Sequence, residues 1–278
     1  TNCSNNYGPK QHNEKLIPDK PYLATCHTNR AHFKNHYDNT VFVSGNHARN
    51  HGANYYVYNG IPVEEYPLRV HKKKELLFLA VLNMRSKNAT TAINLAFDNN
   101  IKVNLTGGNL LQSRQAMGLW IARLPLHFQQ LISHGFVSGD LKMTLLQDAL
   151  ALFYMVKWME PFAIAAHEAL ACGTPVLGSP NGALPEYIVN NKNGFIARTY
   201  EEGRDYIKSL IELSEKERFD LALRCRESAF TIESCAKNYL YFYEKILDQN
   251  GRLYSEKEQP EFDFNPSPTL RLNHPFWR

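Results

Sequence analysis

Apolar residues are densest in the second half of the chain, where two short apolar runs enclose a longer segment. Residues 150–156 and residues 174–178 are runs of the kind that predicts buried parallel strands. Between them, residues 162–172 are predicted to form a helix, because Pro161 can open a helix and Gly173 can close one in the left-handed conformation. The order strand, helix, strand indicates an α/β fold whose chemistry lies at the loop that leaves the first strand.

The predicted helix is apolar on almost every side, and only His167 and Glu168 in it are polar. Such a helix is buried on most faces, so Glu168 needs basic partners or ligand hydroxyls to offset its lost hydration. Glu160 stands eight positions earlier, about 12 Å along a helix axis. That separation exceeds the roughly 5–9.5 Å between two carboxylates that flank one glycosidic bond, and it suits two ends of an extended ligand. We interpret His167 as a packing residue.

A similar alternation of apolar runs and helical spacing covers much of the chain. It predicts further strands at residues 22–26, 40–44, 55–58, 76–82, 101–106 and 133–137. It predicts helices at residues 30–36, 45–51, 90–98, 115–131, 140–149, 200–213, 215–228 and 232–247. A turn signal, Asn59-Gly60-Ile61-Pro62, separates the first three of these strands from the rest.

The two acids lie within EPFAIAAHEALACGTPV, with seven residues between them, and NGALPE and NGFIA follow. This pattern resembles the nucleotide-binding half of the retaining glycosyltransferases called group 1 or family 4, which have GT-B architecture. The resemblance implies a Rossmann-like parallel sheet flanked by helices, with a truncated N-terminal domain. It divides the chain into a polar extended segment, a remnant of the acceptor-side domain, a nucleotide-sugar-binding domain, a crossing helix and a tail, at 1–20, 21–59, 60–231, 232–248 and 249–278. Since about sixty residues precede the hinge, we expect either a fragment or a partner chain that supplies the acceptor side.

The resemblance also implies roles for the residues of the central motif. In that family the first acid contacts the transferred sugar and the second holds the ribose, so these roles fall to Glu160 and Glu168. The amides of Ala163 and Ile164, with Phe162 beside them, are expected to face the donor diphosphate. A helix N-terminus suits this role because its unpaired N–H groups and partial positive charge attract anions. The family usually has glycine where Ala163 stands.

The family's diphosphate clamp is matched only in part. Lys87 fits its lysine, but its glycine and arginine fall on Val81 and Leu82, which carry no charge. Arg85 is the substitute cation that we expect, three positions further along the same loop. The loss matters because much of the catalytic stabilisation acts on the charge of the leaving group.

Two further positions are predicted to contact the donor. Gly107 ends an apolar run at a glycine doublet, where the backbone either approaches a ligand closely or simply turns. The segment His134-Gly135-Phe136-Val137 resembles the family's segment beside the nucleotide base, so main-chain groups near Val137 are expected to read the base.

Composition narrows the function classes without selecting one. Net charge is +4 over 278 residues, which gives no case for nucleic acid or a membrane surface as the principal partner. No apolar run approaches the roughly 20 residues of a membrane helix. The five cysteines show no CxxC spacing and are interpreted as reduced thiols in a cytoplasmic compartment. The histidine pairs His32/His36 and His47/His51 have no carboxylate or cysteine at matching spacing, so no metal site is predicted.

The expected function is transfer of a hexose from a UDP- or GDP-sugar to a saccharide or other hydroxyl acceptor, with retained configuration and without a metal or other cofactor. A non-catalytic nucleotide-sugar-binding module, or a subunit that needs a partner acceptor domain, is the alternative from another class. A glycoside hydrolase is disfavoured by the carboxylate spacing. The plain structural alternative makes Glu160 an exposed turn acid and Glu168 a salt-bridged helix residue.

Overall fold

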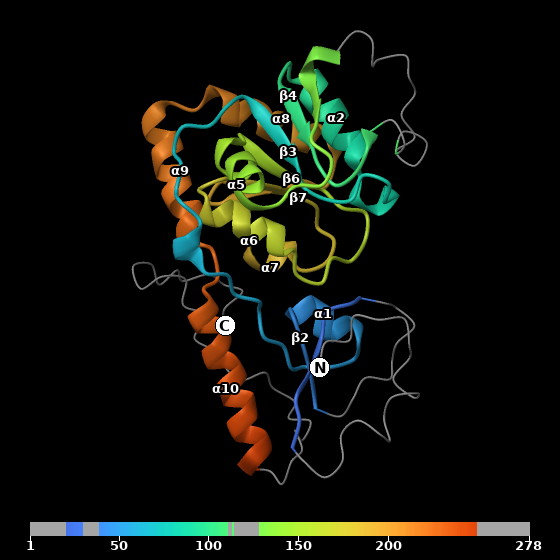
Figure 1. The fold of residues 1–278 in the computed structure, drawn as a ribbon, viewed down its shortest axis with the longest axis vertical. Coiled ribbons are helices and arrows are strands. Elements are labelled where there is room, and N and C mark those ends of the chain that lie inside the picture. The colour runs from blue at the N-terminus through green and yellow to red at the C-terminus, as the bar shows by residue number, and fades with distance from the viewer. Residues whose placement is uncertain (1–20, 30–38, 111–112, 114–127, 249–278) are drawn as a thin grey trace.

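The structure is a computed structural model that describes residues 21–29, 39–110, 113 and 128–248. The segments predicted at 1–20, 30–36 and 249–278, and most of the helix predicted at 115–131, lie outside these residues. Figure 1 shows a larger and a smaller unit joined by two adjacent chain crossings. The crossings pair through the backbone, because Ile61 N donates to Phe230 O and Ile232 N donates to Ile61 O, each at 3.0 Å.

The larger unit is built on a parallel sheet of six strands in the order β5-β4-β3-β6-β7-β8. Its strands are β3 Glu75–Phe78, β4 Lys102–Leu105, β5 Leu131–Ser133, β6 Ala151–Tyr154, β7 Val176–Gly178 and β8 Gly194–Ile196. The central strands β3 and β6 are mainly apolar and buried, because helices pack against both faces of the sheet. The expected α/β class and parallel sheet are confirmed.

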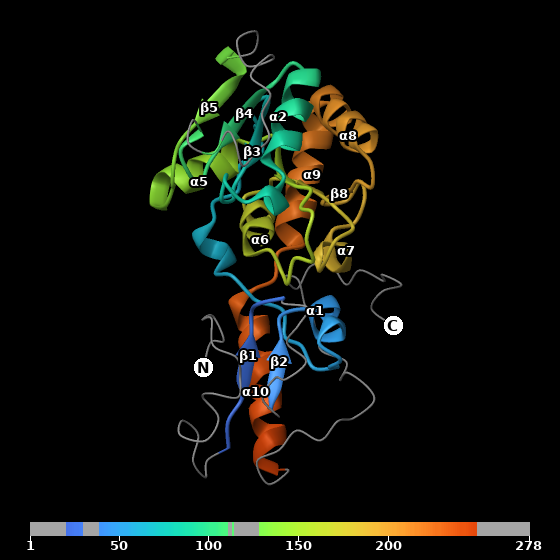
Figure 2. The ribbon, with the colours of Figure 1, turned by 90° about the vertical axis from the view of Figure 1, so that its right-hand side faces the viewer.

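Helices cover both faces of this sheet (Figures 1 and 2). On one face, α2 lies against α8, and on the other α6 lies between α5 and α9. The helices are α2 Ala89–Asp98, α5 Gly139–Asp148, α6 Ile164–Ala171, α7 Leu184–Tyr187, α8 Tyr200–Glu212 and α9 Glu215–Glu227. Short 3-10 turns are η2 Val63–Glu65, η3 Arg85–Lys87 and η4 Phe128–Gln130.

The smaller unit contains β1 Ala24–Cys26, the parallel β2 Thr40–Phe42 and α1 Gly45–Asn50. The long helix α10 Ile232–Asp248 leaves the larger unit and runs beside these strands (Figure 2). Its Phe242 is buried in one cluster with Val41, Tyr55 and Val57. The C-terminal helix therefore completes the core of the N-terminal strands.

Several predicted boundaries are corrected. Residues 55–58 form no strand, and a single parallel bridge joins Phe42 to Tyr56. The strand predicted at 133–137 lies at Leu131–Ser133. The central helix begins at Ile164, two residues later than predicted, because Ala163 takes a left-handed conformation with φ 70° and cannot belong to the helix.

In the described part of the chain, none of the helices combines the length and hydropathy of a membrane span.

Candidate functional site

The strand order of the larger sheet reverses between its central strands β3 and β6. In open α/β sheets, ligands bind outside the carboxyl ends of the strands at this reversal. The loop after β3 carries Lys87 and the loop after β6 carries Glu160, and their side chains meet with Lys87 Nζ 2.8 Å from Glu160 Oε2. The fold thus places a charged pair at the position where a ligand crevice is expected.

Glu160 is buried, with 7% of its surface exposed, so the alternative of an exposed turn acid is wrong. Besides Lys87, the Tyr154 hydroxyl and the Trp158 ring N–H donate to Glu160 Oε2, at 3.1 and 3.0 Å. Lys87 Nζ also lies 4.9 Å from the centre of the Trp158 ring. Burial, and then the charge of Glu160, raises the pKa of Tyr154, which therefore remains a hydrogen-bond donor.

Gly182 fixes the backbone of Glu160 from the next loop. The two residues form a parallel bridge, and Ala183 N donates to Glu160 O at 2.9 Å. A Cβ on Gly182 would lie 2.3 Å from the Glu160 backbone, and its φ of 82° also favours glycine. The glycine of NGALPE is therefore required to hold the acid in place.

Glu168, on α6, is buried with 7% of its surface exposed. Lys142 Nζ on α5 lies 2.7 Å from Glu168 Oε1, and the Tyr66 hydroxyl donates to the same atom at 3.0 Å. Burial, and then the charge of Glu168, raises the pKa of Tyr66. The salt bridge of the plain structural alternative is present, so Glu168 has a protein partner before any ligand binds.

Within the described residues, each acid is held through a single oxygen. All the hydrogen bonds just described end on Glu160 Oε2 or on Glu168 Oε1. Among the described residues, nothing donates to Glu160 Oε1 or Glu168 Oε2, and neither atom belongs to the buried unpaired atoms. The second oxygen of each carboxylate therefore retains some contact with solvent and keeps its capacity to accept a hydrogen bond. A carboxylate can accept such bonds while its cation stays in place.

The N-terminus of α6 lies between the two acids in the sequence. No described side chain caps it, since the preceding residue is Ala163. Ile164, the first helical residue, is 49% exposed, so this end of the helix reaches the surface. Its first N–H groups and partial positive charge are suited to an anion.

The side chain of Phe162 does not reach this surface. It is 2% exposed and stacks on His167, with ring centres 4.7 Å apart and planes 4° from parallel. His167 is fully buried, stacks on Phe230 and accepts from Phe230 N at 3.3 Å. The Phe162 side chain therefore belongs to the core, whereas a donor contact at Phe162 stays a prediction. The interpretation of His167 as a packing residue is confirmed.

The position that corresponds to the arginine of the family's diphosphate clamp carries no charge in this structure. Leu82, which stands at this position, is 1% exposed and belongs to the main core. Arg85 lies with an exposed side chain at the start of η3, the turn that ends at Lys87. The structure brings Lys87 to Glu160, whereas Arg85 stays on the surface of the same loop.

Gly107 and Val137 also lie beyond the carboxyl ends of strands. Gly107 has φ 86°, and a Cβ on it would lie 2.1 Å from Ala80 O, so chain packing alone explains the glycine. Val137 is half-buried in the loop after β5, next to Phe136, which is 80% exposed. Donor contacts at Gly107 and Val137 stay predictions.

Several residues that shape this site escaped sequence reasoning, namely Tyr66, Lys142, Tyr154, Trp158 and Gly182. Three of them come from segments far from the acid they contact, so no local spacing reveals them. Trp158 and Tyr154 were visible in the motif itself, since a buried acid beside aromatic N–H and O–H groups can bond them.

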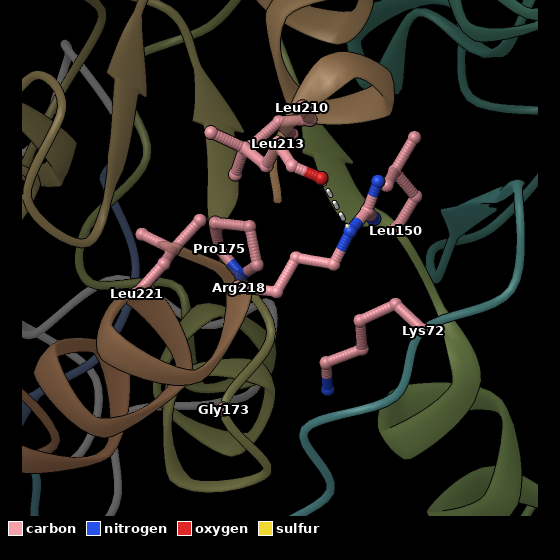
Figure 3. Close-up of a pocket in the computed structure, with 8 residues that line it drawn as sticks. All are labelled: Lys72, Leu150, Gly173, Pro175, Leu210, Leu213, Arg218 and Leu221. Atoms are coloured by element: carbon pink, nitrogen blue, oxygen red, sulfur yellow. Dashed lines mark hydrogen bonds between the residues drawn. The ribbon is translucent and has the colours of Figure 1, made fainter. Parts of the chain in front are cut away.

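A small cavity lies elsewhere, at the amino ends of β6 and β7 (Figure 3). It is lined by Lys72, Leu150, Gly173, Pro175, Leu210, Leu213, Arg218 and Leu221. Burial lowers the pKa of Lys72 to about 8, and its ammonium donates to Gln147 O, Cys172 O and Thr174 Oγ1. With room for about one water molecule and its lysine already bonded, this cavity is a packing defect.

Comparison with known proteins agrees with the geometry. A family model described as "Glycosyl transferases group 1" matches residues 66–231. "Spore coat protein SA" of Bacillus subtilis is 39% identical over 94 residues, which cover 32% of this chain and 25% of that protein. A "Probable sucrose-phosphate synthase" of Thermosipho melanesiensis is 35% identical over 94 residues, 34% of this chain and 22% of that protein. The match thus spans about a quarter of the length of these curated relatives.

Among solved structures, Anabaena Alr3699/HepE in complex with UDP superposes with a TM-score of 0.67. The superposition covers 80% of this chain and 72% of that one at 15% sequence identity. This likeness concerns the fold, which is shared over most of the described chain.

Proposed function

This chain belongs to the group 1 glycosyl transferases, with a fold of GT-B type, and on that premise we propose that it takes part in transferring a hexose from a UDP- or GDP-sugar to a hydroxyl acceptor. The observation that carries the proposal is the pair of buried acids, Glu160 and Glu168, each held through one oxygen with the other open. They flank an uncapped helix N-terminus at the reversal of the sheet. In this order, Glu160, the helix N-terminus and Glu168 suit the sugar, the diphosphate and the ribose of a donor.

Glu168 binds the ribose in this proposal. Its open oxygen accepts from the two ribose hydroxyls, while Lys142 and Tyr66 hold the other oxygen. Lys142 compensates the buried charge of the carboxylate in the free protein, which a ligand hydroxyl alone cannot do. The salt bridge is therefore compatible with ribose binding.

Glu160 binds the transferred sugar in the same manner. Its open oxygen accepts from sugar hydroxyls, and Lys87 on its other oxygen lies where it can also face the diphosphate. The amides of Ala163 and Ile164 are the other diphosphate donors, and Arg85 adds a second cation when its exposed side chain turns inward. Val137 and Gly107 complete the donor site beside the base.

Transfer is proposed to proceed with retained configuration. The acceptor oxygen bonds to the anomeric carbon on the face from which the diphosphate departs, and the hydroxyl proton passes to a diphosphate oxygen. Glu160 then serves as a binding group rather than a nucleophile, and no metal or other cofactor is needed. Positive charge at the helix terminus and at Lys87 stabilises the leaving group.

The state of the cysteines bears on the cellular compartment of the protein. No disulfide joins the described cysteines, and Cys172 and Cys225 are buried thiols. Burial raises the pKa of Cys172 to about 11, which keeps that thiol protonated and unreactive. We propose a reducing, cytoplasmic compartment.

The test is a calorimetric titration of the protein with a panel of UDP- and GDP-sugars, followed by assay of donor hydrolysis. The proposal expects one nucleotide class to bind at micromolar to millimolar concentration, with slow hydrolysis of its sugar. Glu160→Gln should lower hydrolysis more than it lowers affinity for the bare nucleotide, because this acid contacts only the sugar. If neither class binds at millimolar concentration, the proposal fails.

A second candidate is a binding module, or a subunit that depends on a partner for the acceptor side. The buried Leu82 favours it, because the clamp position supplies no charge to the leaving group. Binding of a nucleotide sugar without hydrolysis would select this candidate. Recovery of turnover by Leu82→Arg is not expected, since that site has no room for a guanidinium.

A further inference from the structure

Cys26, His47 and His51 converge in the smaller unit. Cys26 ends β1, His47 lies on α1, and His51 follows it by one helical turn. One ligand atom from each residue lies within 4.8 Å of the other two. All three side chains are buried, with exposed fractions of 8%, 0% and 7%. We propose that these three residues bind a zinc-type ion, independently of the proposed transferase function.

The donor set selects the kind of ion. One thiolate sulfur and two imidazole nitrogens are ligands of Zn²⁺ and related borderline ions, whereas Mg²⁺ and Ca²⁺ require oxygen. With Zn–N about 2.0–2.1 Å and Zn–S about 2.3 Å, ligand atoms in a tetrahedral site lie about 3.3–3.8 Å apart. The three atoms therefore need to close by about 1–1.5 Å at most, which side-chain rotation supplies. Water takes the fourth position.

The surroundings hold both imidazoles in place. The Phe42 ring is stacked on His51 with centres 5.0 Å apart, and it meets His47 edge-on at 5.1 Å. His47 Nε2 lies 3.1 Å from the carbonyl of Thr28, so that nitrogen is the donor and the lone pair resides on Nδ1. Val43 N donates to Nδ1 at 3.5 Å. An ion bound to either ring nitrogen of His47 would replace the contact of that nitrogen and leave the other contact in place, and a hydrogen bond at the second nitrogen is usual for a metal-bound histidine.

The helix that carries the histidines is also fixed at its start. Ser44 caps α1 by accepting from His47 N at 3.0 Å, and the amides of Gly45 and Asn46 donate to Glu186 of the larger unit. The pair of histidines therefore has a defined position relative to β1. Sequence spacing alone did not connect Cys26 to this pair, because β1 and α1 are joined only in the fold.

Such a site would have a structural role. The smaller unit contains one cluster built on Val41, Tyr55, Val57 and Phe242 and another built on Cys26, Phe42 and Ala48. Cores of this size contribute little stability, and small units often add a metal or a disulfide. An ion bound to Cys26, His47 and His51 would join β1 to α1. Binding exchanges the Cys26 thiol proton for the metal–sulfur bond and releases that proton to solvent.

The experiment uses the full chain, freed of metal with a chelator and titrated with Co²⁺ as a spectroscopic probe, then with Zn²⁺ as competitor. We expect the charge-transfer absorption of a Co²⁺–thiolate bond, with one ion per chain, and its disappearance when Zn²⁺ is added. Cys26→Ser should remove the band and weaken Zn²⁺ binding at least about tenfold, and His51→Gln should weaken binding while retaining a thiolate band.

Cys235→Ser is the matched control, because Cys235 is a half-buried thiol beside the same unit. It should keep the band and the affinity. Zn²⁺ should also raise the melting temperature of the wild type and of Cys235→Ser, but not of Cys26→Ser, whose far-ultraviolet circular dichroism checks that it is folded. Absence of a thiolate band in the wild type, or its persistence in folded Cys26→Ser, would overturn the assignment.

Discussion

Glu160 and Glu168 show how a buried carboxylate can serve a protein and a ligand at once. Burial of an ion is costly, and each acid is compensated by one lysine and by hydroxyl or ring N–H donors. Since these partners crowd onto a single oxygen, the other oxygen keeps its capacity to accept. The arrangement holds each acceptor in place before a ligand arrives, which lowers the cost of ordering on binding.

At the residue scale, His167 makes stability depend on pH. Burial lowers its pKa from 6.5 to about 3. Between these values the unfolded chain binds a proton that the folded chain does not, so the free energy of unfolding falls as pH drops below about 6.5. The loss from this residue should reach about 2 kcal/mol at pH 5, measured by urea unfolding at pH 7 and pH 5.

His167→Asn, which can still accept from Phe230 N, should be less stable at pH 7 but lose less on acidification. His71→Asn is the control, because His71 is exposed and its substitution should leave both values unchanged. Equal acid sensitivity in the wild type and in His167→Asn would show that the buried imidazole titrates normally.

At the scale of elements, the start of α6 carries strain that glycine would relieve. Ala163 has φ 70°, a conformation that costs a residue with a Cβ about 1–2 kcal/mol. Ala163→Gly should therefore stabilise the protein by up to about 1 kcal/mol, after allowing for the greater entropy of glycine in the unfolded chain. Nucleotide affinity should be unchanged or higher, because glycine lets a phosphate approach the amides more closely.

Ala165→Gly is the matched control, because Ala165 is the second residue of the same helix and lies two positions after Ala163. It should destabilise the protein by up to about 1 kcal/mol, because glycine has a lower helix propensity than alanine. Thermal unfolding of the two variants side by side gives opposite signs on this account. A loss of stability in both would mean that the left-handed conformation of Ala163 is not strained.

The same element shows where sequence reasoning succeeds and where it stops. The apolar runs at 76–82, 101–106, 150–156 and 174–178 correctly predicted β3, β4, β6 and β7, because strands buried on both faces are apolar throughout. The apolar pattern does not mark where a strand ends, since Leu82 is buried like a strand residue but follows the end of β3. The pattern of apolar and polar residues does not reveal the left-handed conformation of Ala163.

The sequence predicts some residues of the candidate site and misses others. The motif predicts both acids and the helix terminus, because they are close in sequence, and the resemblance to the family's clamp predicts Lys87, which the fold brings to Glu160. Tyr66 and Lys142 were missed, since they reach Glu168 across the fold from segments with no motif of their own. The pattern does not predict that the Phe162 side chain is buried, because an aromatic residue beside a binding loop has the same pattern whether its ring faces ligand or core.

At the scale of the whole molecule, Glu186 connects the two units. Its carboxylate accepts from Gly45 N at 3.0 Å, from Asn46 N and from the Tyr58 hydroxyl at 2.6 Å. Glu186→Gln should cost about 2 kcal/mol of stability, because an amide cannot accept all three bonds and presents N–H groups to other donors. Hydrogen exchange at the amides of Gly45 and Asn46 should become faster.

Glu212→Gln, at the exposed C-terminal end of α8, is the control and should change neither stability nor exchange. Unaltered exchange in Glu186→Gln would indicate that the smaller unit is positioned by α10 and the crossings alone. Destabilisation without faster exchange at α1 would lead to the same conclusion.

The central claim is that a nucleotide lies across the carboxyl edge of the larger sheet with its ribose on Glu168. The most direct measurement is the dissociation constant of UDP and of GDP for the wild type and for Glu168→Gln, determined by calorimetry. The variant keeps the shape of the side chain and removes its charge. We expect the dissociation constant of the bound nucleotide to rise at least about tenfold at a temperature where the variant is fully folded. The melting temperature should fall because Lys142 loses its ion pair, and neither quantity should change in the Glu212→Gln control. An unchanged dissociation constant in Glu168→Gln would contradict the account.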